Sequence, residues 1–254
     1  TLAASLPPLP DVAALPPAVQ AAVREADAAA RATPDAATVG AYGRACHAAQ
    51  LADCALGAYR VAEALAPDDL AWTYHRALLL EERGDDTVVD ALTRVTASQP
   101  AHGHAWLRLG DTYFKRGRLD DANAAYARAE ASPAVAAFTP PGVTSRQTWP
   151  LGAYAGIGLA RVALERGDTA AARTRLTALA AAYPGFSPAR GLLRQVDAQA
   201  GSAAGSYVPP ADPVVDALVA TSRHSDLLLK HAGLATRAGD TAWREFLVRR
   251  ALEF

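Results

Sequence analysis

Apolar residues recur along this chain at helical spacing, and the predicted helices come in pairs. The clearest pair lies within residues 103–134. Gly117 interrupts its apolar pattern and favours a turn, because glycine readily adopts the left-handed conformation that ends helices. Pro133 ends the second helix, since proline lacks the backbone donor that a further turn requires. The apolar and small positions are Trp106, Leu109, Gly110 and Tyr113, then Ala122, Tyr126 and Ala129. The segment therefore predicts a helical hairpin.

Prolines and tryptophans that mark equivalent positions of the predicted hairpins recur at a nearly fixed interval. Pro67, Pro100 and Pro133 follow one another at 33-residue steps, and Trp72 and Trp106 are 34 residues apart. A period of this length is typical of stacked helical hairpins. We therefore predict full hairpins over about 36–67, 69–100, 103–134 and 153–184, followed by a half-repeat over 187–200.

The residue order of the 103–134 segment resembles the tetratricopeptide repeat: W-x2-L-G-x2-Y, then glycine, alanine, an aromatic residue, alanine and proline. The resemblance extends over about 36–200 and, weakly, over 225–254. One departure is His75-Arg76, where the family prefers leucine and glycine. The resemblance implies an all-α fold, a right-handed α-solenoid of antiparallel hairpins. The alanine-rich repeats also resemble those of bacterial proteins in secreted or envelope assemblies, which implies a periplasmic or secreted location.

The segments outside the repeats have their own composition. Residues 1–35 read as a proline-rich arm, which either docks to a partner or lies over the first helices, and a capping helix from about Pro17 to Ala32. An insertion over 135–150 interrupts the array, contains Pro140-Pro141-Gly142, and carries Arg146 as its one basic residue. A flexible linker is expected over 201–212, and C-terminal helices with a diverged hairpin over 213–254.

Composition narrows the class of protein. The chain has 254 residues and is 51% hydrophobic, enough to bury a substantial core. Its net charge of -1 argues against a nucleic-acid partner. No apolar run approaches the about 18 residues that predict a membrane span. Because methionine is absent, we expect that Thr1 is not a translation start and that the chain is part of a longer protein.

The two cysteines allow two interpretations. Cys46 and Cys54 fall on the two helices of the first predicted hairpin. They could form a disulfide that clips this hairpin, which would persist only in an oxidising compartment. Alternatively, both are buried thiols that pack as small apolar groups.

No catalytic or metal-binding motif emerges from the sequence. The chain lacks G-x-S-x-G, a phosphate-binding glycine loop and H-E-x-x-H. His102 and His104 fall short of a closed metal site, and His224 and His231 are better explained by packing. We therefore predict no catalytic residue, no metal and no cofactor.

The resemblance implies that the first helix of each hairpin lines a concave groove. The groove positions of the family fall on Arg44, His47, Thr73, Glu81, Leu107, Asp111, Phe114, Lys115, Tyr154, Ile157, Arg161 and Glu165. Mixed charges beside apolar groups suit a protein or peptide partner. Alternatively, the arm or the insertion of the chain itself covers part of the groove.

The sequence thus predicts a non-catalytic scaffold for protein–protein or protein–peptide interaction. Two alternatives remain: a regulatory or targeting region of a larger enzyme or envelope assembly, and a self-assembling homo-oligomer that pairs through its final helix.

Overall fold

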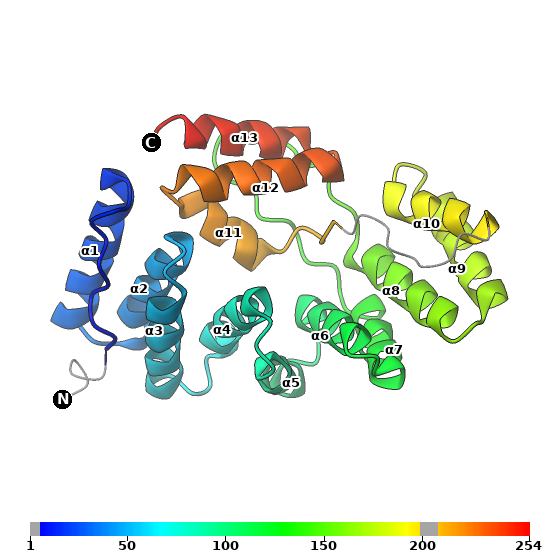
Figure 1. The fold of residues 1–254 in the computed structure, drawn as a ribbon, viewed down its shortest axis with the longest axis horizontal. Coiled ribbons are helices and arrows are strands. Elements are labelled where there is room, and N and C mark those ends of the chain that lie inside the picture. The colour runs from blue at the N-terminus through cyan, green and yellow to red at the C-terminus, as the bar shows by residue number, and fades with distance from the viewer. Residues whose placement is uncertain (1–5, 199–207) are drawn as a thin grey trace. The chain divides into compact units, whose positions relative to one another are not determined.

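The structure is a computed structural model that describes residues 6–198 and 208–254. Over these ranges the chain is built from helices and contains no strand (Figure 1), so the predicted all-α class, a solenoid of helical hairpins, is confirmed. The helices are α1 (Pro17–Ala32), α2 (Ala36–Ala48), α3 (Ala52–Leu65), α4 (Leu70–Arg83), α5 (Val88–Ser98), α6 (Gly103–Lys115), α7 (Leu119–Glu130), α8 (Leu151–Glu165), α9 (Thr169–Ala182), α10 (Ser187–Asp197), α11 (Pro213–Thr221), α12 (Ser225–Ala238) and α13 (Thr241–Ala251).

The helices belong to two compact units, and neither unit is continuous in sequence. The first unit contains the described residues up to Ala91, together with 137–147 and 212–254. The second contains 92–136 and the described part of 148–211. Part of the expected linker, and the ends of the N-terminal arm and of the half-repeat, fall on residues 1–5 and 199–207, outside the described residues.

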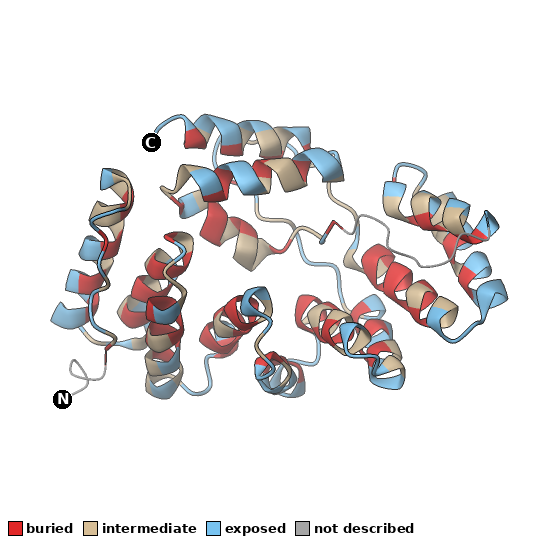
Figure 2. Cartoon of the chain, in the orientation of Figure 1, coloured by how far each residue is buried: buried red, intermediate tan, exposed pale blue. Residues whose placement is uncertain are grey.

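Hairpins in both units close by setting a glycine of the first helix against a tyrosine of the second. A Cβ added to Gly110 of α6 would lie 2.6 Å from the ring of Tyr126 in α7. The equivalent Cβ on Gly43 of α2 would lie 2.7 Å from Tyr59 in α3. Each tyrosine is fully buried, and buried and exposed residues alternate along most of the helices (Figure 2). Glycine is required here because any side chain would hold the two helices apart.

Local sequence signals explain where individual helices begin and end. The side chain of Asp35 caps α2 by accepting a hydrogen bond from the backbone N–H of Thr38 at 2.8 Å. Gly117, the predicted turn residue between α6 and α7, has a positive φ of 70°. Cys46 of α2 and Cys54 of α3 are joined by a disulfide.

The insertion contributes an extended segment, residues 137–147, that packs with the C-terminal helices of the first unit; we call it the strap. Arg146 of the strap donates to Asp216 in α11 at 2.7 Å and to Asp240, at the start of α13, at 2.8 Å. It also donates to the carbonyl of Phe138 at 2.7 Å and stacks over the Trp243 ring at 4.4 Å. The strap therefore fixes α11 and α13 through one buried guanidinium.

Candidate functional site

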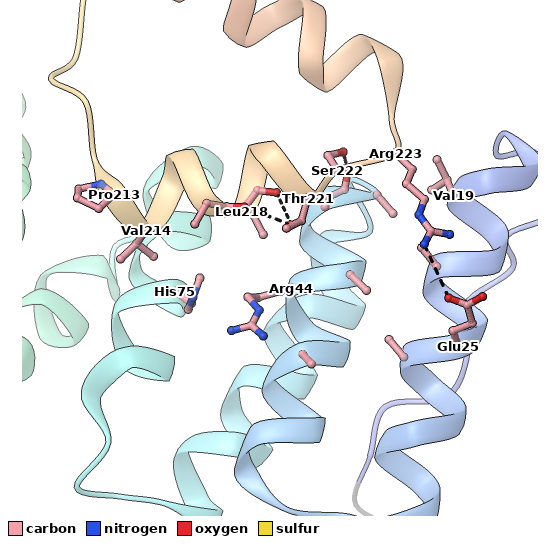
Figure 3. A pocket seen from close by; sticks show the side chains of 17 residues that line it. Val19, Glu25, Arg44, His75, Pro213, Val214, Leu218, Thr221, Ser222 and Arg223 are labelled. Atoms are coloured by element: carbon pink, nitrogen blue, oxygen red, sulfur yellow. Dashed lines mark hydrogen bonds and ion pairs between the residues drawn. The ribbon is translucent and has the colours of Figure 1, made fainter. Parts of the chain in front are cut away.

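An open pocket of about 760 Å³ lies in the first unit between α1, α2, α4 and α11 (Figure 3). Small and apolar side chains supply most of its walls. From α1 come Val19, Ala22 and Ala26. From α2 come Ala41, Ala45 and Ala48, with Ala49 directly after the helix. From α11 come Pro213, Val214, Ala217 and Leu218. The pocket exists because alanines of α1 and α2 face α11 without filling the space between the helices.

Both ends of α11 are attached to the first two repeats. At its start, Asp212 accepts a hydrogen bond from the hydroxyl of Tyr74 in α4 at 2.6 Å. Just after its end, the Ser222 hydroxyl donates to the Ala48 carbonyl of α2 at 3.3 Å. Together with the Arg146–Asp216 ion pair, these contacts hold α11 across the pocket.

Two guanidinium groups reach the pocket. Arg44 is exposed, lies 5.4 Å from the Trp72 ring, and forms no ion pair with a carboxylate in the described parts of the chain. Arg223 lies 4.0 Å from Glu25, and the two side chains are 39% and 70% exposed. Figure 3 shows Arg44 below α11, between His75 and the Arg223–Glu25 pair. The pocket thus contains one more cation than anion.

His75 of α4 is the buried polar residue of this pocket. Its ring stacks on Tyr59 and Trp72, at centroid distances of 5.3 and 5.8 Å. The pKa of His75 is lowered to about 4, chiefly by burial and also by the nearby Arg44 and His47, while Asp212 opposes them. The imidazole is therefore neutral at pH 7. Its Nδ1 is buried and has no hydrogen-bond partner among the described residues.

A second candidate surface is formed by α6 and α8 in the second unit. The Arg161 guanidinium of α8 lies 4.2 Å from the centre of the Phe114 ring of α6, and both side chains are partly exposed. Lys115 and Glu165 are exposed at the ends of these two helices. Asp111 accepts a hydrogen bond from the Tyr126 hydroxyl at 2.7 Å and so faces the second helix of its own hairpin.

The predicted groove residues divide by burial. Arg44, Lys115 and Glu165 are exposed, and Glu81, Asp111, Phe114 and Arg161 are partly exposed. The buried ones are His47, Thr73, Leu107, Tyr154 and Ile157. Leu107, Tyr154 and Ile157 join the core of the second unit, and His47 lies 3.3 Å from the Tyr59 hydroxyl. These five side chains cannot reach a partner in this conformation, because neighbouring helices already cover them.

Sequence reasoning did not identify α11 as a covering element. The alternative considered there was that the arm or the insertion covers the groove. The arm packs on the first helices, as one of its two interpretations predicts: Arg31 of α1 donates to the Pro7 carbonyl at 3.0 Å. The local signal for the pocket was His75, which replaces the leucine that the family prefers. No local pattern connects His75 to Val214, because the two are far apart in the chain.

Within residues 6–198 and 208–254, no group of three or more histidine, cysteine, aspartate and glutamate side chains is arranged to hold a metal ion. No helix in the same ranges has the length and apolar character needed to cross a membrane.

Comparison with known proteins agrees with this architecture. The sequence pattern of the tetratricopeptide repeat family matches residues 104–131 and 154–185, which cover α6–α7 and α8–α9. A crystal structure of MamA is similar, with 18% identity, a TM-score of 0.51, and coverage of 62% of this chain and 84% of that chain. A tetratricopeptide repeat protein from Parabacteroides merdae has 15% identity, a TM-score of 0.55, and 92% coverage of both chains. At these identities the likeness is one of fold. No curated protein sequence matches the chain significantly.

Proposed function

Because this chain contains tetratricopeptide repeats within an all-α solenoid, we propose that it is a non-catalytic scaffold that binds a segment of a partner protein on the surface of α6 and α8. This surface lies within the two hairpins that match the family. First helices of adjacent hairpins supply it, which is where solenoid repeats offer extended binding surfaces.

The observation that carries the proposal is the Phe114–Arg161 pair. An arginine stacked on an aromatic ring keeps its outer N–H groups available for hydrogen bonds. Arg161 forms no ion pair with a carboxylate over the ranges that the structure describes, so its charge is free for a ligand. Aromatic and arginine side chains are the residue types that most often carry binding energy at protein interfaces.

The chemistry of the surface specifies what it would bind. Arg161 and Lys115 offer two cations against the one exposed carboxylate of Glu165, and Phe114 offers an apolar platform beside them. An acidic side chain next to an apolar one would satisfy both, because the carboxylate pairs with the guanidinium while the apolar group covers the ring. The partner segment we propose therefore carries an acidic residue beside an apolar residue.

The test begins with selection of random displayed peptides on the purified chain. Affinities of the selected peptides are then measured by fluorescence anisotropy for the wild type, Phe114→Ala and Arg161→Gln. We expect each substitution to weaken binding by about tenfold or more, since residues of this kind each contribute roughly 1–2 kcal/mol or more at interfaces. Arg190→Gln is the matched control, because Arg190 is an exposed arginine of α10 without an ion pair among the described residues.

The selected sequences provide a second readout. Enrichment of acidic residues beside apolar ones is expected. Peptides that bind Phe114→Ala and Arg161→Gln as tightly as the wild type would show that this surface is not the binding site.

A further inference from the structure

We propose that the pocket between α1, α2, α4 and α11 binds a small organic acid with an apolar tail, held by its carboxylate on Arg44. This site lies in the first unit and is independent of the peptide surface proposed on α6 and α8. Three properties of the pocket support this assignment: its room, its charge and one buried nitrogen.

The helices around the pocket are fixed in positions that leave space for a ligand. The pocket is open to solvent, and the helices around it are attached to one another, so it is a preformed recess and not a void in the core. The volume of about 760 Å³ falls within the roughly 300–1,000 Å³ of small-molecule pockets. The Tyr74–Asp212 and Ser222–Ala48 hydrogen bonds hold α11 at both ends while the alanines below it leave the space open.

The charge selects an anion. Arg44 and Arg223 contribute two cations, and Glu25 contributes one anion. The Arg223–Glu25 pair is wide, at 4.0 Å, and solvated, whereas Arg44 has no carboxylate partner in the part of the chain that is described. A guanidinium matches a carboxylate through two parallel hydrogen bonds, which gives orientation as well as binding energy.

The buried nitrogen supplies a second polar contact. The His75 residue is only 6% exposed, and its Nδ1 has no hydrogen-bond partner among the described residues. Leaving such a group unpaired is costly. Nδ1 has no accessible surface in the structure, so a polar atom of the ligand would relieve that cost only when the His75 ring turns this nitrogen toward the pocket. A neutral imidazole can donate through one nitrogen and accept through the other, so it adds no charge that would compete with Arg44 for the carboxylate.

The walls select the rest of the ligand. Most of the wall is apolar, and its hydroxyl groups, Thr221 and Ser222, lie together at the end of α11, so a sugar would find few partners along it. A linear or compact hydrocarbon tail would instead remove apolar surface from water on both sides of the gap. Head group and tail together define an amphipathic carboxylate of small-molecule size.

Octanoate is the probe, titrated into the full chain by isothermal titration calorimetry, with 1-octanol and octylammonium as probes that differ only in the head group. We expect octanoate to bind at least tenfold more tightly than either of them. Arg44→Gln should weaken octanoate binding by about tenfold or more, since a charge-assisted bidentate pair is lost. Arg60→Gln should leave it unchanged, because Arg60 is an exposed arginine of α3 that does not line the pocket.

A second variant tests the place of binding. Ala45→Phe fills the pocket from α2 and should abolish octanoate binding while the circular dichroism spectrum stays that of the wild type. Octanoate that fails to bind the wild type, or that binds Arg44→Gln or Ala45→Phe as tightly, would overturn the proposal. Binding of an apolar tripeptide with a free C-terminus in place of octanoate would also overturn it, because the ligand would then be a chain terminus.

Discussion

The hairpins α6–α7 and α12–α13 have the same architecture but are held together by different chemistry. In α6–α7, Gly110 lets the ring of Tyr126 lie directly against the first helix, and both residues come from the same repeat. In α12–α13, an apolar core that includes Leu228 and Leu247 is supplemented by Arg146 of the strap. The α6–α7 contact joins two residues of one repeat. The α12–α13 hairpin also depends on Arg146, which lies 94 residues from its partner Asp240.

The two hairpins differ in how strongly a single substitution is expected to destabilise them. Apolar contacts weaken in proportion to the atoms removed, whereas a buried charge pair fails when either member is lost. Arg146, Asp216 and Asp240 are all nearly inaccessible, with side-chain exposures of 4%, 8% and 3%. The C-terminal hairpin is therefore the more sensitive of the two to the loss of one functional group.

The largest effect is expected from Arg146→Met. The change removes the cation and leaves the carboxylates of Asp216 and Asp240 buried without it, which should lower the free energy of unfolding by about 3–5 kcal/mol. Urea unfolding followed by tryptophan fluorescence measures it, because Trp243 stacks on Arg146.

The control for this variant removes the carboxylates as well. In the triple variant Arg146→Met, Asp216→Leu, Asp240→Ser, no buried charge is left unpaired, and the introduced serine hydroxyl can still cap α13. Most of the lost stability should return. If Arg146→Met alone lowers the free energy of unfolding by less than about 1 kcal/mol, which is what a surface ion pair contributes, the role assigned to Arg146 is wrong.

The next effect is a pH dependence that belongs to the C-terminal hairpin. The pKa of Asp216 is raised to about 6, chiefly by burial; Arg146 opposes the shift, and Asp212 and Asp240 add to it. The folded state therefore keeps a proton that the unfolded state has already released, so this group's contribution to stability falls as pH rises from about 4 to about 6. The unfolding free energy of the wild type minus that of Asp216→Asn should fall across this window by up to about 3 kcal/mol.

The titration of His75 changes the stability with pH in the opposite direction, so its contribution needs a separate control. Its folded pKa of about 4 lies below the ordinary value of 6.5, so its contribution is present above pH 6.5 and is lost as pH falls. Carrying His75→Gln in both proteins removes this background, and the difference assigned to Asp216 should persist. A difference that is constant between pH 4 and pH 6 would exclude Asp216 as its source.

The smallest effect is expected in α6–α7, from Gly110→Ala. The new Cβ would lie 2.6 Å from the Tyr126 ring, and overpacking of this kind costs about 1–3 kcal/mol. Gly191→Ala in α10 is the matched control, because nothing lies within 4 Å of its added Cβ. The control should gain up to about 1 kcal/mol from helix propensity. Equal gains in both variants, by chemical denaturation, would show that Tyr126 does not require glycine at 110.

The hairpins could be predicted because their determinants are local. The spacing of small and aromatic residues in 103–134 is the spacing of α6 and α7, and the helix expected from Pro17 to Ala32 is α1 with the same bounds. Positive φ at Gly117 follows from the same logic. Helical periodicity records contacts between residues three and four apart, so it reports these elements directly.

The strap and the pocket could not be predicted because they depend on contacts between residues far apart in the chain, and no repeating sequence pattern reports such contacts. Arg146 stood out as the one basic residue of the insertion, yet its partners Asp216 and Asp240 lie 70 and 94 residues further along. Likewise, nothing near Arg44 or His75 in the sequence indicates that α11 lies across the pocket that both residues line. The burial of Leu107, Tyr154 and Ile157 was missed for a related reason, since a single repeat does not show what its neighbours cover.

The strap also has a consequence for the order in which this chain folds. Hairpins such as α2–α3 make contacts between residues close in sequence, so they can form as soon as both helices have been synthesised. Arg146 must wait until Asp240 has been made, by which time α8, α9 and α10 have already emerged. The unit that contains the first helices is therefore completed after the second unit, and Arg146 makes its full set of buried contacts only once α13 has begun.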